Sequence, residues 1–132
     1  MTAAHDRRVR GVAQMLMASN FAEVVWTGLA TKHIRDSFAG FIDLPNLKKS
    51  WAIVSPDSYI PNLADNDTKL LMITGKYDPV FLPYLSKEII DMYKEYEVDY
   101  YWKELSCGHY TIGEIRPICY TLGKTLLWLR GL

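Results

Sequence analysis

The chain has 132 residues, with fifteen acidic and fifteen basic side chains, so its formal net charge is zero. This balance argues against the basic surface that a nucleic-acid-binding domain needs, and the length is enough for one domain with its own core. Hydrophobic residues make up 49% and aromatic residues 13%. These fractions are high for a soluble domain, so the surplus has to be buried, either within the fold or against a partner.

Several classes of protein are not indicated by the sequence. Its two cysteines, Cys107 and Cys119, are too few for a disulfide framework, and its three histidines are scattered, so we expect neither a metal site nor a cofactor. No apolar stretch approaches the roughly 20 residues that cross a bilayer, and residues 1–8 lack an apolar signal core. We therefore expect a cytoplasmic protein without membrane contact.

The first predicted element is a strand over residues 9–18, where an alternating pattern passes into a solidly apolar run. A helix over the same residues is the alternative. A helical pattern follows over residues 20–38, with Asn20 as N-cap and Glu23 at the capping-box position. Gly28 weakens its middle, so two short helices are the alternative there.

The next segment is interpreted as mainly irregular. Residues 47–50 add a helical turn, and residues 51–61 form a connector in which Ser-Pro and Ile-Pro steps disfavour helix. Residues 64–68 then form a polar loop.

A buried strand is predicted at Leu70, Leu71, Met72 and Ile73, because this apolar run is short and has no polar alternation. Gly75 ends it, and Asp78 follows in the turn at its carboxyl end. Open α/β sheets carry their functional groups at such ends. Asp78 is therefore the first candidate for a functional residue.

A second unit of the same kind follows. An amphipathic helix is predicted from Pro83 to about residue 96, and an aromatic strand over residues 100–105. The loop after that strand carries His109. A final helix covers residues 115–129, and four of its apolar residues share one face: Ile118, Leu122, Leu126 and Leu129.

The order strand, Asp78, helix, strand, His109, helix resembles the C-terminal half of an α/β-hydrolase. Residues 75–79 (Gly-Lys-Tyr-Asp-Pro) are similar to that family's acid loop, and residues 107–110 (Cys-Gly-His-Tyr) to its histidine loop. The resemblance implies an α/β fold with about three parallel strands and flanking helices. It also implies that Asp78 is the orienting acid and His109 the general base of a catalytic triad, and that residues 20–63 are a cap-like helical insertion in a single truncated domain, 1–132.

The nucleophile of that family is missing. It lies in a Gly-x-Ser-x-Gly turn upstream of the acid, and no such pattern occurs in this sequence. Cys107 is a candidate replacement, but it lies on the same loop as His109 and is better explained as a small apolar group. Simpler roles exist for the other two residues as well: Asp78 could cap the helix that begins at Pro83, and His109 could be a hydrogen-bonded loop residue.

Two hypotheses for the function follow. The chain is the downstream part of a serine hydrolase acting on esters or peptides, inactive until an upstream half supplies the nucleophile. Alternatively, it is a non-catalytic interaction module that associates with itself. The strand at residues 9–18 would be an uncovered edge, so a homodimer through this strand is the expected form of self-association.

Overall fold

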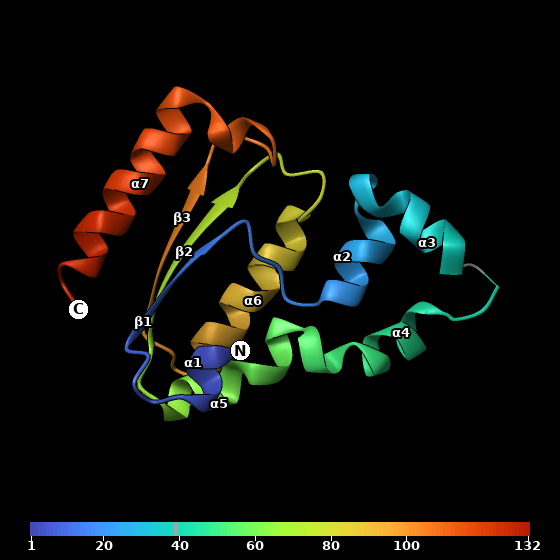
Figure 1. The fold of residues 1–132 in the computed structure, drawn as a ribbon, viewed down its shortest axis with the longest axis horizontal. Coiled ribbons are helices and arrows are strands. Elements are labelled where there is room, and N and C mark those ends of the chain that lie inside the picture. The colour runs from blue at the N-terminus through green and yellow to red at the C-terminus, as the bar shows by residue number, and fades with distance from the viewer. Residues whose placement is uncertain (39) are drawn as a thin grey trace.

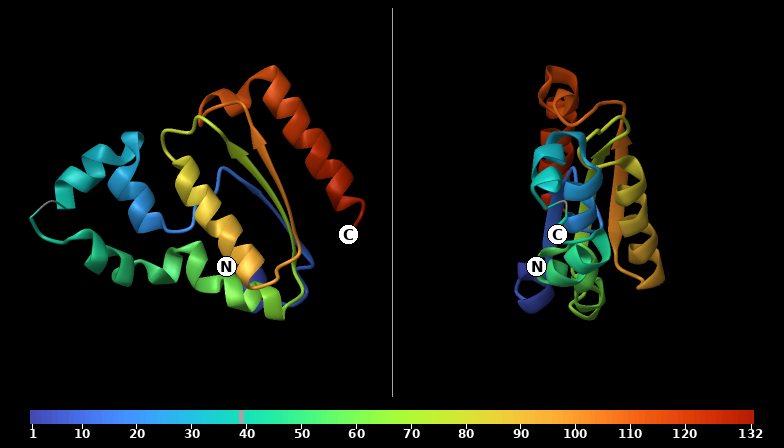
Figure 2. Two further views of the ribbon diagram at one scale, coloured as in Figure 1. Left: turned by 180° about the vertical axis from the view of Figure 1, so that it is seen from behind. Right: turned by 90° about the vertical axis from the view of Figure 1, so that its right-hand side faces the viewer.

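The computed structural model describes residues 1–38 and 40–132 and contains one parallel sheet of three strands in the order β1-β2-β3. Helices α6 (Pro83–Glu95) and α7 (Ile115–Leu129) lie on opposite faces of this sheet, and helices α2 (Phe21–Thr27), α3 (Lys32–Phe38) and α4 (Leu44–Ser50) form a helical arm that extends beside α6 (Figures 1 and 2). The α/β fold with about three parallel strands is confirmed. The strands are β1 (Gly11–Met15), β2 (Lys69–Gly75) and β3 (Tyr100–Leu105).

The helices and 3-10 turns occur in the following order: α1 (Thr2–His5), α2 (Phe21–Thr27), η1 (Leu29–Thr31), α3 (Lys32–Phe38), α4 (Leu44–Ser50), η2 (Ala52–Val54), η3 (Pro56–Tyr59), α5 (Ile60–Asp65), α6 (Pro83–Glu95), η4 (Thr111–Gly113) and α7 (Ile115–Leu129). Within the described chain, no helix is both long and apolar enough to cross a membrane.

Strand β2 is the centre of the core. It is buried from Leu70 to Gly75, as its apolar sequence predicted, because it pairs with a strand on each side. Leu70 and Met72 belong to a buried cluster that includes Ile89 and Tyr93 of α6. Side chains alternate across a strand, so the intervening residues of β2 face α7.

Strand β1 is shorter than the predicted strand over residues 9–18, and the helix alternative for that segment is wrong. The strand ends at Met15 because Leu16 has a left-handed backbone conformation, with φ of 51°, which turns the chain away from the sheet. β1 pairs only with β2 and is therefore an edge strand. The side chain of Met15 is 42% exposed on this edge.

The segment that follows β1 is more helical than the sequence suggested. The pattern over residues 20–38 divides at Gly28 into α2 and α3, which is the alternative that this glycine favoured. The prediction of an irregular connector over residues 51–61 is wrong, because η2, η3 and the start of α5 lie there. Pro56 and Pro61 occupy first helical turns, where a backbone N–H needs no helical partner. Residues 64 and 65 end α5 instead of beginning a loop.

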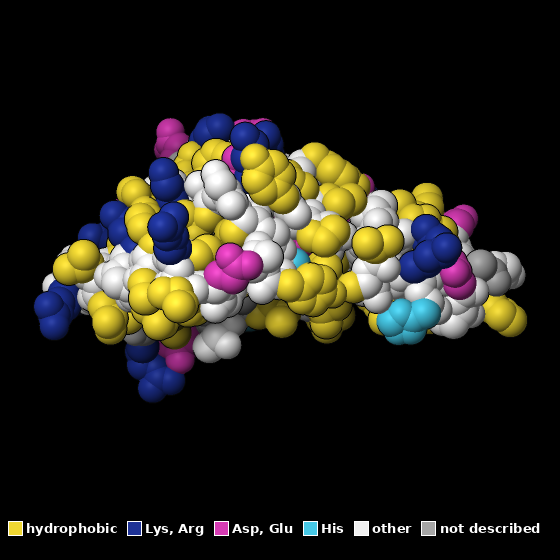
Figure 3. All heavy atoms as spheres, turned by 90° about the horizontal axis from the view of Figure 1, so that it is seen from above, with side chains coloured by type: hydrophobic (Ala, Val, Ile, Leu, Met, Phe, Trp, Pro, Cys, Tyr) yellow, Lys and Arg dark blue, Asp and Glu magenta, His cyan; other side chains and the backbone are white. Residues whose placement is uncertain are grey.

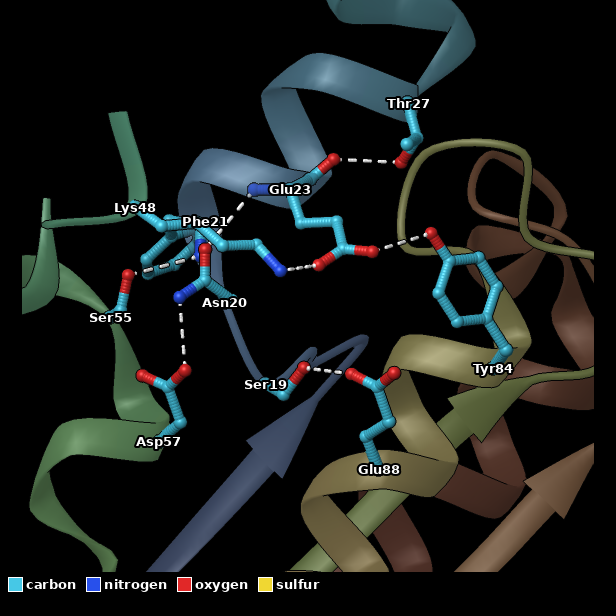
Figure 4. A network of polar contacts seen from close by, with 10 residues as sticks. All are labelled: Ser19, Asn20, Phe21, Glu23, Thr27, Lys48, Ser55, Asp57, Tyr84 and Glu88. Atoms are coloured by element: carbon cyan, nitrogen blue, oxygen red, sulfur yellow. Dashed lines mark hydrogen bonds and ion pairs between the residues drawn. The ribbon is translucent and has the colours of Figure 1, made fainter. Parts of the chain in front are cut away.

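A network of polar contacts attaches this helical arm to α6 (Figure 4). Asn20 caps α2 by accepting a hydrogen bond from the Glu23 backbone, as predicted, at 3.2 Å. The Glu23 carboxylate does not complete a capping box. It forms an ion pair with Lys48 of α4 and accepts a hydrogen bond from the Tyr84 hydroxyl of α6 at 3.1 Å. Ser19 donates to Glu88 of α6 at 2.8 Å.

Helix α7 has the predicted bounds. The apolar face predicted for it is largely open to solvent, and Leu122, Leu126 and Leu129 are 53%, 62% and 48% exposed. Thr121 is the residue of α7 that is fully buried. The C-terminal end of the chain instead fits against Gly11 of β1, where an added Cβ would lie 2.8 Å from the Trp128 ring.

This packing gives a stability test. Ile89→Ala should lower the free energy of unfolding by about 2–5 kcal/mol, because Ile89 is fully buried against β2. Leu126→Ala should change it by less than about 0.5 kcal/mol, because this side chain is mostly in solvent. Urea denaturation of both variants measures the difference. Equal losses would contradict the packing of α7.

Candidate active site

The loops that follow β2 and β3 lie directly against each other at the carboxyl end of the sheet. The backbone N–H of Tyr77 donates to the Cys107 carbonyl at 3.0 Å. A Cβ on Gly75 would lie 2.8 Å from that same oxygen, and one on Gly108 would lie 2.9 Å from the Tyr77 oxygen. Both glycines are therefore needed for the close approach, which brings the residues that follow them together.

Asp78 is held in this junction and is 3% exposed. Its Oδ1 accepts hydrogen bonds from the backbone N–H groups of Val80 at 2.8 Å and Phe81 at 2.9 Å. Both donors precede α6, so Asp78 does not cap the helix that begins at Pro83, which was the simpler explanation for this residue. These two bonds fix the carboxylate and leave Oδ2 free for another partner.

That partner is His109, whose Nδ1 lies 3.1 Å from Oδ2 of Asp78. The carboxylate can only accept a hydrogen bond, so Nδ1 carries the proton and Nε2 of the neutral ring keeps its lone pair. Phe81 stacks on the imidazole with ring centres 5.4 Å apart, and Tyr110 contacts it edge-on at 5.3 Å. The ring is thus oriented by one hydrogen bond and two aromatic contacts, while its side chain stays 26% exposed.

The position of the proton defines what the pair can do. A neutral imidazole with a free Nε2 can accept a proton from a hydroxyl or a water molecule, and the buried carboxylate stabilises the imidazolium that forms. In the described part of the chain, no serine, threonine or cysteine side chain is hydrogen-bonded to the imidazole. The same part holds no cluster of three or more His, Cys, Asp or Glu side chains suited to a metal ion.

Cys107 does not fit the role of nucleophile. It is 5% exposed, and burial together with the nearby charges of Asp78 and Glu114 raises the pKa of its thiol. A raised pKa keeps the thiol protonated at neutral pH, whereas the thiolate is the reactive form. The packing of Cys107 agrees with the role of a small apolar group.

Two residues at this site were not found from the sequence. Phe81 is three positions after Asp78, and its ring covers one face of His109. Thr111 accepts a hydrogen bond from the Gly108 backbone at 2.7 Å and so shapes the histidine loop. Neither has a motif of its own. Their proximity to Asp78 and His109 along the chain is the only signal that could have indicated them.

The helical arm also reaches this junction. The backbone N–H of Leu29 donates to the Pro79 carbonyl, next to Asp78, at 3.0 Å. Gly28 lies so close to the same loop that a Cβ on it would be 3.0 Å from the Val80 oxygen. Residues of the predicted cap-like segment therefore support the loop that carries the acid.

The orientation of His109 can be tested by changing the acid to an amide. In Asp78→Asn, the amide oxygen should keep the two backbone N–H groups, so its NH₂ would face His109. Nδ1 would then have to accept, and the proton should move to Nε2. Long-range ¹H–¹⁵N correlation spectra distinguish the two tautomers. An Nε2-protonated ring in the unchanged protein would contradict the assigned geometry.

Comparison with solved structures places this arrangement in a known fold. The chain is similar to a Pyrococcus horikoshii acylaminoacyl peptidase (TM-score 0.71, 13% identity, 95% of this chain and 20% of that one). It is also similar to a puromycin-hydrolyzing peptidase of Mycobacterium tuberculosis (TM-score 0.60, 14% identity, 78% of this chain and 15% of that one). No protein-family model and no curated sequence match it.

The chain thus spans a fifth or less of each of these two peptidases, both of the α/β-hydrolase superfamily. The expected resemblance to an α/β-hydrolase is confirmed for the fold. We conclude that residues 1–132 have the structure of a part of the α/β-hydrolase fold, with three parallel strands and their flanking helices.

Proposed function

We propose that this chain supplies the acid and the base of a serine-hydrolase active site, Asp78 and His109, and that the nucleophile comes from another polypeptide segment. The observation that supports this is the 3.1 Å contact between Oδ2 and Nδ1, with the carboxylate anchored by two backbone N–H groups. A buried acid that is fixed in this way orients an imidazole without being protonated itself.

The proposed reaction is acyl transfer from a carboxylic ester or amide. Nε2 of His109 takes the proton of the incoming serine hydroxyl as the hydroxyl oxygen attacks the carbonyl carbon. The proton then passes to the leaving alcohol or amine, and water completes the hydrolysis by the same route. The similar solved structures are described as peptidases, which favours an amide substrate. The isolated chain, without a nucleophile, is proposed to be inactive.

The helical arm is proposed to act as a cap over the completed site. Its hydrogen bond from Leu29 to Pro79 places it beside the acid loop, and its polar network attaches it to α6. A substrate bound near Nε2 of His109 would then lie between the arm and the segment that carries the serine.

The proposal is tested by adding the missing part. The isolated chain should neither hydrolyse p-nitrophenyl acetate above background nor react with a fluorophosphonate probe. Co-expression with a hydrolase segment that carries the Gly-x-Ser-x-Gly turn should produce both turnover and a labelled serine. Asp78→Asn and His109→Gln should each lower that turnover by at least roughly a hundredfold, since general-base catalysis contributes about that much or more.

His5→Gln is the matched control, because His5 is exposed on α1, outside the helical arm and the site. It should leave turnover unchanged. Labelling of the isolated chain would show that a nucleophile is already present. Turnover that survives His109→Gln in the assembled protein would mean that this histidine is not the base.

The open edge of β1 favours a second candidate, a non-catalytic module that associates with itself. β1 bonds to β2 through alternate residues, and bonds involving Arg10 and Leu16 flank the ladder. The backbone groups of Gly11, Ala13 and Met15 therefore point to the free edge. Two copies related by a two-fold axis could pair these edges antiparallel and form one continuous sheet.

Light scattering after size-exclusion chromatography distinguishes a monomer from a dimer that pairs through β1. The chain should elute as a dimer, and Met15→Lys should convert it to a monomer, because a lysine on an edge strand disfavours pairing. Leu29→Lys is the control, since Leu29 is 72% exposed but lies away from this edge. A dimer that persists in Met15→Lys would exclude β1 as the interface.

A further inference from the structure

The imidazole of His109 needs more than its hydrogen bond to be held in one plane. In the described part of the chain, the ring has one hydrogen-bond partner, Asp78, which it meets through Nδ1. The ring can tilt about this bond, and each tilt changes the direction in which Nε2 points. Because Nε2 is the atom that takes the proton in the proposed reaction, a second contact has to fix the plane of the ring.

Two described aromatic residues contact the imidazole, and they differ in what holds them. Tyr110 is adjacent to His109 in the chain and 74% exposed, so its position depends on the histidine loop itself. Figure 3 looks onto the carboxyl end of the sheet, where this loop lies, and shows hydrophobic side chains exposed to solvent there. Phe81 belongs to the acid loop instead, and its ring is inclined to the imidazole by only 28°. Phe81 can therefore fix the plane of the imidazole relative to Asp78.

Phe81 contacts both members of the acid–base pair. Its backbone N–H donates to Oδ1 of Asp78 at 2.9 Å, and its side chain stacks on the ring of His109. The placement of this one residue thus contributes to the position of the carboxylate and to the orientation of the imidazole.

The helical arm holds Phe81 in place. The Phe81 ring meets the ring of Phe21 at 66°, with the ring centres 6.5 Å apart. Phe21 is the first residue of α2, and its backbone N–H donates to Oγ of the fully buried Ser55 at 3.2 Å (Figure 4). Phe81 also packs against a small buried cluster, whose members are Ala18, Val24 and Leu85. The arm therefore reaches His109 through one intervening ring.

We propose that Phe81 and Phe21 are positioning residues of the proposed active site. Phe81 fixes the plane of the His109 ring, and Phe21 of the arm holds Phe81 against that ring. Both residues act through His109, so their roles rest on the proposed function, in which this histidine is the base. The arm then has a second role besides that of a cap, because one of its residues orients the base.

A simpler explanation is that the two phenyl rings only fill the space between α2 and α6. Leucine fills much of the same space but has no flat face on which an imidazole can stack. If the rings only fill space, Phe81→Leu should lower the stability and leave the imidazole unchanged. If Phe81 is a positioning residue, the imidazole should change in a chain that is still folded.

The state of the imidazole is measured on the isolated chain by long-range ¹H–¹⁵N spectra, recorded where the ring is neutral. The unchanged protein should show His109 with its proton on Nδ1. In Phe81→Leu the bond to Asp78 should form only part of the time, so the Nε2–H tautomer, which a free imidazole prefers, becomes populated. The difference between the ¹⁵N shifts of the two ring nitrogens should therefore shrink. Phe21→Leu should shrink it less, and Phe81→Tyr should preserve it, because tyrosine keeps the flat ring.

Phe38→Leu is the matched control, because Phe38 makes a similar edge contact with Trp51 at 6.1 Å within the arm. It should leave the His109 signals unchanged, and circular dichroism checks that each variant is folded. An unchanged imidazole in folded Phe81→Leu would overturn the role of Phe81, and the same result in Phe21→Leu would overturn that of Phe21. If Phe81→Leu does not fold, Phe21→Leu decides for both residues, since it leaves Phe81 in the chain.

Turnover of the assembled hydrolase gives a second readout. Phe81→Leu should lower kcat by at least about tenfold with little change in KM, because a misdirected base slows the chemical step. Phe81→Tyr should keep most of the turnover. The spectra require no nucleophile, so the two proposals fail separately. Unchanged spectra would contradict the positioning roles, whereas an assembled protein without turnover would contradict the proposed function.

Discussion

The parallel pairing of β2 with β3 is the constraint on which the rest of this structure depends. Parallel strands end at the same edge of a sheet, so the loops that carry Asp78 and His109 emerge side by side although the two residues are 31 positions apart. Gly75 and Gly108 then let the loops touch through their backbones. The 3.1 Å contact between Asp78 and His109 is a consequence of this topology and of the two glycines, which have no side chain to keep the loops apart.

Asp78 is anchored more firmly than His109. Asp78 is buried and accepts two backbone N–H groups, while His109 keeps part of its ring in solvent. The geometry therefore holds the carboxylate in one position and leaves one edge of the imidazole open to solvent. The helical arm contributes to the anchoring, because Leu29 is bonded to the residue after Asp78.

The surfaces without partners are the other prominent feature of the molecule. β1 has a free edge, and α7 exposes apolar side chains such as Leu122, Leu126 and Leu127 to solvent, in a chain whose hydrophobic fraction is already high. Both surfaces lie outside the core around β2, and they differ in kind. The edge of β1 offers backbone hydrogen bonds, which any extended chain can satisfy. The outer face of α7 offers exposed apolar side chains instead.

The sequence by itself determined the central elements of the fold and the two candidate site residues. The apolar run of β2 could only be a strand covered on both faces, and the positions of Asp78 and His109 after successive strands placed them at one edge of the sheet. The bounds of α6 and α7 were likewise evident from their periodicity, and those of β3 from its aromatic residues. Such patterns are local in sequence, because the burial of one face of a helix or strand fixes where apolar residues recur along it.

Only the tertiary structure decided the rest. Helical periodicity shows which residues of α7 share a face, but not which face meets the sheet, since that depends on the shape of the sheet around Gly11. Proline disfavours the interior of a helix, so residues 51–61 were predicted to be irregular. Pro56 and Pro61 nevertheless lie in first helical turns, where proline is tolerated. The stacking of Phe81 on His109 joins two loops that are distant in sequence, and such contacts are set by packing in three dimensions, which no local pattern records.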